Sequence, residues 1–159
     1  MKFDIRSATS DDAATLAVMR YDFRASLQPA TEDRSAFIGR VETWMRDRLA
    51  SPDWRAWVAV ADDRIAGTIW LHRMEKMPNP VGEAAAIGYI TNTFVLPDLQ
   101  SSGIGSALLK AVIEFSEREG YHTLILWPAP RSRAFYMRQG FEPRDNVFAR
   151  VVADPGVHR

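Results

Sequence analysis

The residues of this chain that are best placed for chemistry form a short run rich in glycine and serine. It reads Gln100-Ser101-Ser102-Gly103-Ile104-Gly105-Ser106 and follows an apolar, β-branched stretch that ends in Val95-Leu96-Pro97. Glycine lets the backbone approach a ligand closely, and the first turn of a helix offers N–H groups with a partial positive charge. A strand that leads through such a turn into a helix is suited to binding a phosphate or pyrophosphate group.

Two common nucleotide-binding motifs fit this run less well. A dinucleotide-binding turn has the pattern GxGxxG after the first strand, but Leu108 stands at the third glycine position. A nucleoside triphosphate loop needs a Lys-Ser or Lys-Thr pair after its glycine, and the chain has no such pair. The two glycines taken alone also fit an ordinary strand-to-helix turn in which Ser102 caps the helix.

Composition limits the class of protein. The chain has 159 residues, of which 47% are hydrophobic, so we expect one domain over residues 1–159. Its 20 basic and 20 acidic residues cancel, which argues against nucleic acid or an anionic membrane surface as a partner. It has no cysteine, and its three histidines have no ligand spacing, so we expect no metal site.

The chain also has no obvious targeting signal. The residues MKFDIRSATS at its start lack the apolar core of a signal peptide, and no stretch approaches the roughly 18 apolar residues of a membrane span. We therefore expect a soluble cytoplasmic protein.

Apolar periodicity predicts the elements before the glycine turn. Residues 3–8 alternate as in a strand, and Thr9 and Ser10 then offer helix-capping side chains. Two amphipathic helices follow: the first reaches Pro29, and the second begins near Thr31 and ends at Ser51-Pro52-Asp53. We then expect an antiparallel pair of strands and a longer third strand, over residues 54–61, 65–74 and 86–96.

The same reasoning predicts the elements after the turn. A helix should end at Gly120, and the almost wholly apolar residues 122–127 should form a strand covered on both faces. A short helix over Ser132 to Gln139 should end at Gly140, and residues 141–152 should supply one or two final strands. The sum is an α/β fold with a mixed sheet.

The order of these motifs resembles the GNAT superfamily of acyl-coenzyme A dependent N-acyltransferases, whose signature [QR]xxGx[GA] follows a central strand. Gln100, Gly103 and Gly105 match that signature, and Phe135-Tyr136-x-x-x-Gly140-Phe141 is similar to the family's FYxxxGF element. The match covers roughly residues 86–141. It implies a GNAT-like fold with a central mixed, mostly antiparallel β-sheet flanked by helices, in the order β-α-α-β-β-β-α-β-α-β(β).

The resemblance implies acetyl-coenzyme A as the acyl donor and suggests which residues bind it. The main chain of Phe94, Val95 and Leu96 would pair with the pantetheine arm as an added strand would. Ser132 and Arg133 are available near the phosphates, whereas Pro128-Ala129-Pro130 replaces an asparagine that often contacts the cofactor in this family. The pyrophosphate would bind the backbone N–H groups of Gln100, Ser101, Ser102, Gly103, Ile104, Gly105 and Ser106.

The resemblance also suggests a proton donor. Tyr136 is similar to the tyrosine that protonates the departing coenzyme A thiolate, and a phenol holds its proton at neutral pH. The base that deprotonates the amine is left unassigned. The side chains considered for it, or for holding a water molecule that serves it, are His72, Glu75, Glu83, Thr91 and Asn92.

Acceptor selection in this family comes mainly from the first two helices and the loop before the central strand. Arg20 and Arg24 of the first helix either bind a carboxylate or form a solvated face. Trp44 of the second helix falls on the apolar stripe, which favours core packing.

Three functions are compatible with these residues. The first is direct transfer of an acetyl group, in a ternary complex, to a primary amine of a small molecule or protein, and the lack of cysteine agrees with it. The second is a noncatalytic module that binds or senses acyl-coenzyme A. The third is a structural domain without a coenzyme A site. A homodimer is common in the family and is considered for this chain.

Overall fold

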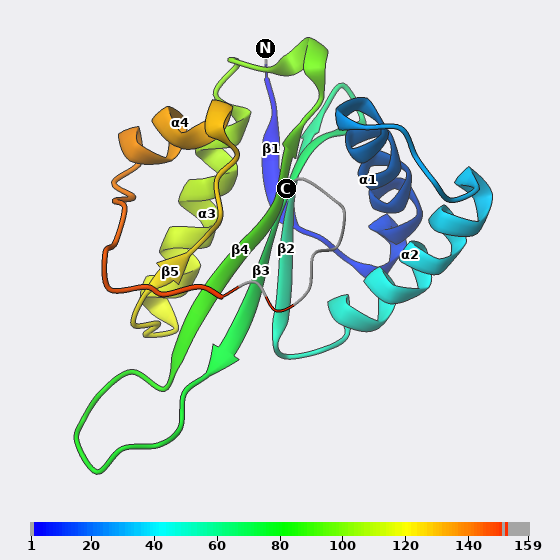
Figure 1. Ribbon diagram of the computed structural model, residues 1–159. Coiled ribbons are helices and arrows are strands. Elements are labelled where there is room, and N and C mark those ends of the chain that lie inside the picture. Colours follow the sequence, from blue (N-terminus) through cyan, green and yellow to red (C-terminus); the bar gives the residue numbers. More distant parts are fainter. Residues whose placement is uncertain (1, 151, 153–159) are drawn as a thin grey trace. The chain divides into compact units, whose positions relative to one another are not determined.

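The structure of the chain is a computed structural model, and it describes residues 2–150 and 152 (Figure 1). These residues fall into two compact units, Met1–Leu126 and Trp127–Arg159, which are described in turn. Within the part of the chain that the structure describes, no helix is both long and apolar enough to span a bilayer.

The first unit is built around a five-stranded sheet with the order β1-β2-β3-β4-β5. Its first four strands pair antiparallel in sequence order, and the fifth joins β4 in parallel. This arrangement confirms the predicted mixed, mostly antiparallel sheet. The strands are β1 (Asp4–Ser7), β2 (Trp54–Ala61), β3 (Arg64–Glu75), β4 (Ala86–Val95) and β5 (Leu124–Ile125).

Helices cover both faces of this sheet. The helices α1 (Ala13–Leu27) and α2 (Arg34–Leu49) lie on one face, and α3 (Ile104–Arg118) lies on the other (Figure 1). The predicted second helix starts three residues late, at Arg34, because the Asp33 carboxylate caps it by accepting from the Ala36 N–H at 3.0 Å.

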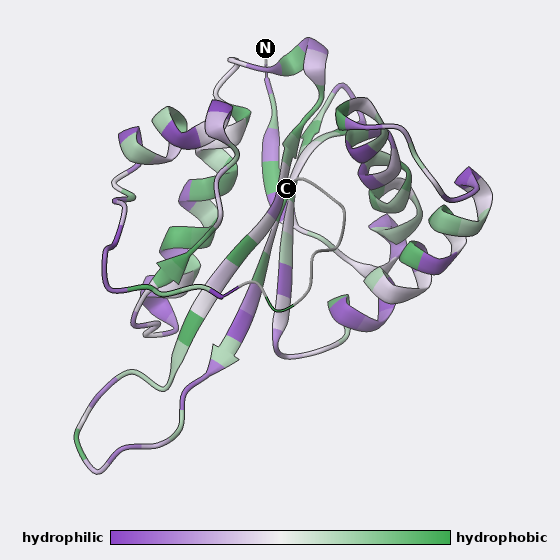
Figure 2. Ribbon diagram, in the orientation of Figure 1, coloured by the Kyte–Doolittle hydropathy of each residue, from purple (hydrophilic) through white to green (hydrophobic). Residues whose placement is uncertain are grey.

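Two sets of apolar side chains hold the layers together. Beneath α1 and α2, Leu16, Met45 and Val58 pack with Trp70 of β3, and each is at most 3% exposed. On the opposite face α3 buries four apolar side chains completely, and Figure 2 shows hydrophobic residues recurring along this helix. They are Ile104, Leu108, Leu109 and Val112. Together these contacts fix α3 against the sheet, and with it the glycine turn that precedes the helix.

A tight hairpin joins β2 to β3, as predicted. Asp62 and Asp63 both have positive φ, at 48° and 57°, which is the conformation of a two-residue turn with both central residues left-handed. Aspartate tolerates this conformation better than most residues, because its side chain is short and polar.

A β-bulge interrupts β4 near its end. The register with β3 shifts between the pairs Trp70–Thr91 and Thr68–Phe94, so that Asn92 and Thr93 together lie opposite Ile69. Asn92 has a positive φ of 49°. A bulge of this kind bends the strand and turns its side chains to new directions.

The strand predicted over residues 122–127 is much shorter in the structure, and its predicted burial on both faces is wrong. Only Leu124 and Ile125 form β5, they pair with Gly88 and Tyr89, and both are half-buried. The apolar run is therefore only partly used for pairing, because β4 and β5 have no further ladder pairs after Tyr89.

The second unit contains α4 (Arg133–Arg138), which falls inside the helix predicted over Ser132 to Gln139. Gly140 follows it with a φ of 86°, as expected after a helix end. The final strands predicted over residues 141–152 are wrong for the described residues 142–150, which form no strand and are exposed; Val151 lies outside the described residues. Pro143 lacks an N–H donor, and the polar residues Arg144-Asp145-Asn146 after it favour a turn over a strand.

Candidate functional site

The glycine turn joins β4 to α3 through a backbone that only some residues adopt readily. Ser101 and Gly103 have positive φ values of 63° and 91°, and Gly103 is the residue that precedes the first turn of α3. The Ser102 hydroxyl donates to the Leu99 carbonyl at 2.6 Å, which braces the turn from inside. A Cβ atom added at Gly103 would meet no atom beyond its immediate chain neighbours within 4 Å, so the space beside this residue is open.

The first turn of α3 offers backbone donors to that open space. The Ala107 N–H makes the first bond of the helix, to the Gly103 carbonyl at 3.0 Å, so the N–H groups of Ile104 and Gly105 have no acceptor within the helix. The helix dipole adds a partial positive charge at this end. Because the Ile104 side chain is completely buried, the donors are carried on a fixed backbone.

The other predicted residues of the turn lie at its surface. Gln100, Ser101 and Ser102 are exposed, whereas Ser106 is half-buried in the first turn of the helix. The Gln100 side-chain amide donates to the Val95 carbonyl at 3.4 Å. The structure thus brings all seven predicted residues of the turn into one local arrangement at the start of α3.

The end of β4 has a main-chain edge that β5 does not cover. The Leu96 N–H donates to the Ala66 carbonyl and the Leu96 carbonyl accepts from Leu99, both at 2.9 Å, so the main-chain groups of Leu96 are already used. Hydrogen bonding alternates along an antiparallel pair, so Phe94 faces β3 and the main chain of Val95 faces the opposite edge. Val95 is therefore the member of the predicted trio that is oriented to pair with an added strand.

The remaining predicted site residues lie in the second unit. Tyr136 is 8% exposed, and its ring packs edge-on against Phe135 and Phe141 at centroid distances of 5.0 and 5.7 Å. The Ser132 hydroxyl donates to the Ala129 carbonyl at 3.0 Å, and Arg133 is an exposed residue in the first turn of α4. That these residues share a site with the glycine turn stays a prediction.

The side chains considered as bases have different surroundings in the first unit. The His72 ring is stacked on Trp54, with centroids 4.3 Å apart and planes at 14°, while Glu75 is exposed at the end of β3. A hydrogen bond from Asn79, followed by one from Lys76, lowers the pKa of the Glu83 carboxyl and makes it a weaker proton acceptor. Among the described residues, no group of three or more His, Cys, Asp or Glu side chains is arranged to hold a metal ion.

The two helices expected to select the acceptor present a half-buried arginine and a partly exposed tryptophan. Arg20 Nη1 donates to Asn92 Oδ1 at 3.1 Å, and burial, with Arg24 adding to the effect, lowers the pKa of Arg20. The apolar stripe of the second helix predicted that Trp44 packs in the core. The centroids of the Trp44 and Trp54 rings are 5.1 Å apart, but Trp44 is 40% exposed, so it lies at the rim of the core. Sequence reasoning missed the contact between Arg20 and the bulge, because the two residues are 72 positions apart.

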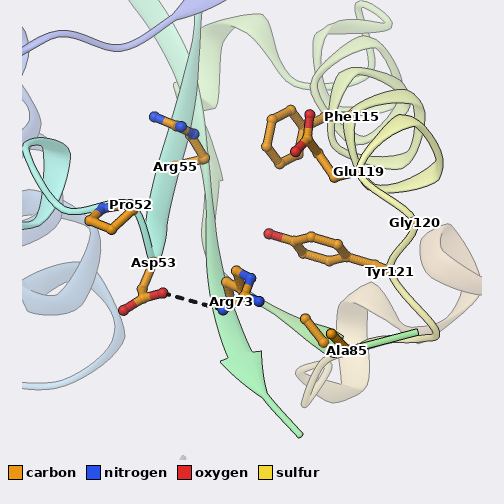
Figure 3. A pocket seen from close by; sticks show the side chains of 10 residues that line it. Pro52, Asp53, Arg55, Arg73, Ala85, Phe115, Glu119, Gly120 and Tyr121 are labelled. Carbon is orange, nitrogen blue, oxygen red and sulfur yellow. Dashed lines mark ion pairs between the residues drawn. The ribbon is translucent and has the colours of Figure 1, made fainter. Parts of the chain in front are cut away.

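A separate pocket of about 450 Å³ lies beside the last turn of α3, at the end of that helix opposite to the glycine turn (Figure 3). Arg55, Arg73 and Tyr121 line it together with two carboxylates, and burial raises the pKa of Tyr121. Asp53 Oδ1 lies 3.7 Å from Arg73 Nη1, and the other carboxylate is Glu119. The pocket therefore balances its own charges.

Comparison with known proteins identifies a family that this chain matches. The model of the acetyltransferase (GNAT) family matches residues 19–141. An uncharacterized N-acetyltransferase of Methanocaldococcus jannaschii is 35% identical over 81 residues, which are 49% of this chain and 32% of that protein. The match to this curated relative thus spans about a third of the relative's length.

Solved structures share the fold. A predicted acetyltransferase of Clostridium acetobutylicum, crystallised with acetyl-CoA, superposes with a TM-score of 0.79 at 18% identity, covering 95% of this chain and 97% of that one. A GCN5-related N-acetyltransferase of Ralstonia eutropha gives 0.73 at 22% identity, covering 96% of this chain and all of that one. At these identities the similarity establishes the architecture.

Proposed function

Since the chain belongs to the acetyltransferase (GNAT) family, we propose that it is an N-acetyltransferase that moves the acetyl group of acetyl-coenzyme A directly to a primary amine in a ternary complex. The observation that carries this proposal is the glycine turn, where the open space beside Gly103 lies next to the N–H groups of Ile104 and Gly105, which have no acceptor within α3.

The residues of the turn fit a pyrophosphate. The start of a helix contributes up to about 2 kcal/mol to binding an anion in partly buried geometry, and each hydrogen bond to a charged oxygen contributes about 1.5–3 kcal/mol. The N–H groups of Gly103, Ile104 and Gly105 would make these bonds. Since the donors belong to the backbone, the exposed side chains of Gln100, Ser101 and Ser102 matter less than the shape of the turn.

The main chain of Val95 would bind the pantetheine arm. Its N–H and carbonyl face the edge of β4 that β5 leaves uncovered, and an amide-containing arm pairs with such an edge as an extended peptide does. The Gln100 amide now bonded to the Val95 carbonyl is long, at 3.4 Å, and exposed, so it yields readily to a better donor.

When bound, acetyl-coenzyme A supplies an acetyl group as a thioester, so that an N–C bond replaces a C–S bond, the amine loses a proton and the sulfur gains one. We assign the donation of that proton to the Tyr136 hydroxyl, because a phenol remains protonated at neutral pH. The Tyr136 ring packs edge-on against Phe135 and Phe141, and such contacts help to hold the side chain of a proton donor in place.

Binding of acetyl-coenzyme A to a Gly103→Val variant tests the role of the turn. We expect calorimetry to show affinity reduced at least about tenfold, because a β-branched residue is strained at a φ of 91° and would fill the open space. Gly39→Val is the matched control, since a Cβ at Gly39 of α2 also meets nothing within 4 Å. Equal affinity in Gly103→Val and wild type would contradict the assignment of the pyrophosphate to this turn.

A further inference from the structure

One half-buried cation of the first unit has no acidic partner among the described residues. Arg20 follows Leu16 by one turn on α1, is half-buried, and bonds through Nη1 to the neutral side-chain oxygen of Asn92. Nearby, the Phe23 and Phe94 rings lie 4.8 Å apart. The second half of α1 is thereby packed against the bulged end of β4.

The charge of this arginine has no carboxylate opposite it. Tyr89 is its favourable electrostatic neighbour, and the effect of Tyr89 on the pKa of Arg20 is smaller than the effects of burial and of Arg24. Across residues 2–150 and 152, no carboxylate forms an ion pair with Arg20 or with Arg24, one turn further along α1. Arg6 shows the contrary case in the same unit, because both its terminal nitrogens bond the Asp12 carboxylate at 2.8 Å. The pKa of Arg6 is raised by that pairing, whereas the pKa of Arg20 is lowered by burial and by Arg24.

Removing a guanidinium from water is unfavourable unless an anion or several acceptors replace the lost hydration. Arg20 has five N–H donors in a planar fork, of which Asn92 accepts one. The remaining donors suit an oxyanion, which an arginine binds through two parallel hydrogen bonds. An external anion would thus supply what the chain itself does not.

Arg20 lies close to the strand to which we assign the acetyl donor, so an anion bound by Arg20 can belong to the acceptor. Asn92 lies at the bulge of β4, and Val95, three residues further along the same strand, carries the edge to which we assign the pantetheine arm. A molecule bound at Arg20 therefore lies beside the strand along which the acetyl donor binds. This step rests on the proposed function.

We propose that Arg20, oriented by Asn92, binds an anionic oxygen group of the acceptor, so that the substrate is a small primary amine that also carries a carboxylate or a phosphate. Arg24 adds positive charge to the same site.

Matched pairs of acceptors test the proposal. β-Alanine against β-alaninamide changes only the carboxylate, and O-phosphoethanolamine against ethanolamine changes only the phosphate. We expect wild-type kcat/KM to favour the anionic member of one pair by about tenfold or more. The pair that shows the preference identifies the oxyanion. Equal rates within both pairs, or acetylation of amines from neither pair, would overturn the proposal.

Two variants separate recognition from a merely structural role. Arg20→Gln should reduce the preference for the anionic member to about onefold, and Arg20→Lys should retain only part of it, because a lysine lacks the fork. Asn92→Asp places a carboxylate against Arg20, and aspartate tolerates the positive φ at this position. We expect Asn92→Asp to fold at least as stably as wild type yet to lose the preference, since the internal carboxylate competes with the acceptor.

Arg118→Gln is the control, because it removes the same charge from an exposed position on α3 and should leave the ratio of kcat/KM values unchanged. If Asn92→Asp retained the wild-type preference, Arg20 would not bind the acceptor. Calorimetric measurement of acetyl-coenzyme A binding by wild type and by each variant separates a failure of the proposed function from a failure of this inference. If the wild-type protein did not bind acetyl-coenzyme A, the proposed function would be contradicted. If it bound acetyl-coenzyme A but showed no preference for anionic acceptors, only this inference would be contradicted.

Discussion

The hydroxyl of Tyr136 is the one side-chain group to which we assign a proton transfer, and phenylalanine is the substitution that removes it and keeps the ring. Tyr136→Phe should lower kcat by about 10² to 10⁴-fold, since general acids commonly contribute that much. The variant keeps the ring and its contacts with Phe135 and Phe141, and its melting temperature, measured alongside, shows whether the fold is retained.

Steady-state kinetics from about pH 6 to 9 measure this effect. Tyr121→Phe is the matched control, because it removes a phenol from the pocket at the far end of α3. Wild-type turnover by Tyr136→Phe over the whole pH range would exclude the acid role.

The pair formed by Arg6 and Asp12 links stability to pH. Hydrogen bonds from Arg6, and then one from the Thr9 N–H, hold the pKa of the Asp12 carboxyl below its ordinary value. A lowered pKa in the folded state means that the pair stabilises fully above the unfolded pKa of about 4 and that this contribution is lost as the pH falls through the folded pKa. Asp12→Asn should therefore cost about 1–2 kcal/mol at neutral pH, a moderate value because half of Arg6 is exposed.

Urea unfolding at neutral pH and near pH 3 checks this prediction, with Asp11→Asn, an exposed neighbour, as the control. The difference between wild type and Asp12→Asn should shrink at the lower pH. A difference of the same size at both pH values would show that the charge of Asp12 contributes nothing.

Residue types predicted only part of the site. Gly103 and the serines around it were identifiable from the sequence because a phosphate-binding turn depends on local backbone shape, which glycine spacing encodes. The hydrogen bond between Arg20 and Asn92 was not identifiable from the sequence, because the amphipathic pattern of a helix does not indicate which strand a polar residue of that helix contacts. The one available signal was Asn92 itself, an asparagine within an otherwise β-branched and apolar strand, since asparagine favours positive φ.

At the level of elements, the fit between β3 and α3 determines where the glycine turn lies. A Cβ added at Gly67 would stand 3.0 Å from the Phe94 carbonyl oxygen and 3.1 Å from the Ile104 side chain. Gly67→Ala should therefore destabilise the protein by about 1–3 kcal/mol, the usual cost of overpacking. It should also weaken acetyl-coenzyme A binding several-fold, since Ile104 is the first residue of α3.

Thermal unfolding and calorimetry measure the two effects of Gly67→Ala. Gly82→Ala, in the loop between β3 and β4, is the control because an added Cβ there meets nothing within 4 Å. A loss of stability with wild-type affinity for the donor would mean that the start of α3 does not depend on its packing against β3.

Elements with strong local signals were predicted well. The hairpin between β2 and β3 and the helix α3 follow from turn residues and from a 3.6-residue period, both of which act over short stretches. The strand over residues 122–127 was overextended because an apolar run does not reveal how far its partner accompanies it. The bulge at Asn92, which orients the end of β4, is a property of the pairing between β3 and β4 and has no clear pattern of its own.

For the molecule as a whole, charge gives no guidance toward an acceptor, because the basic and acidic residues are equal in number and produce no broad field. We therefore expect selection to depend on local groups, as we propose for Arg20, rather than on long-range attraction. The fold was predictable because its elements occur in the order of a known family. The acceptor was not, because it depends on contacts between elements distant in the sequence.

The most direct test of the central claim is an acceptor screen. Purified protein is mixed with acetyl-coenzyme A and a panel of primary amines, and mass spectrometry follows the N-acetylated products while a thiol assay follows free coenzyme A. We predict that at least one amine is acetylated with an equal amount of thiol released, and that Gly103→Val strongly reduces both signals when the donor concentration is near the wild-type Kd. Tight binding of acetyl-coenzyme A without any product or thiol release across the panel would contradict it and would indicate a noncatalytic binding module.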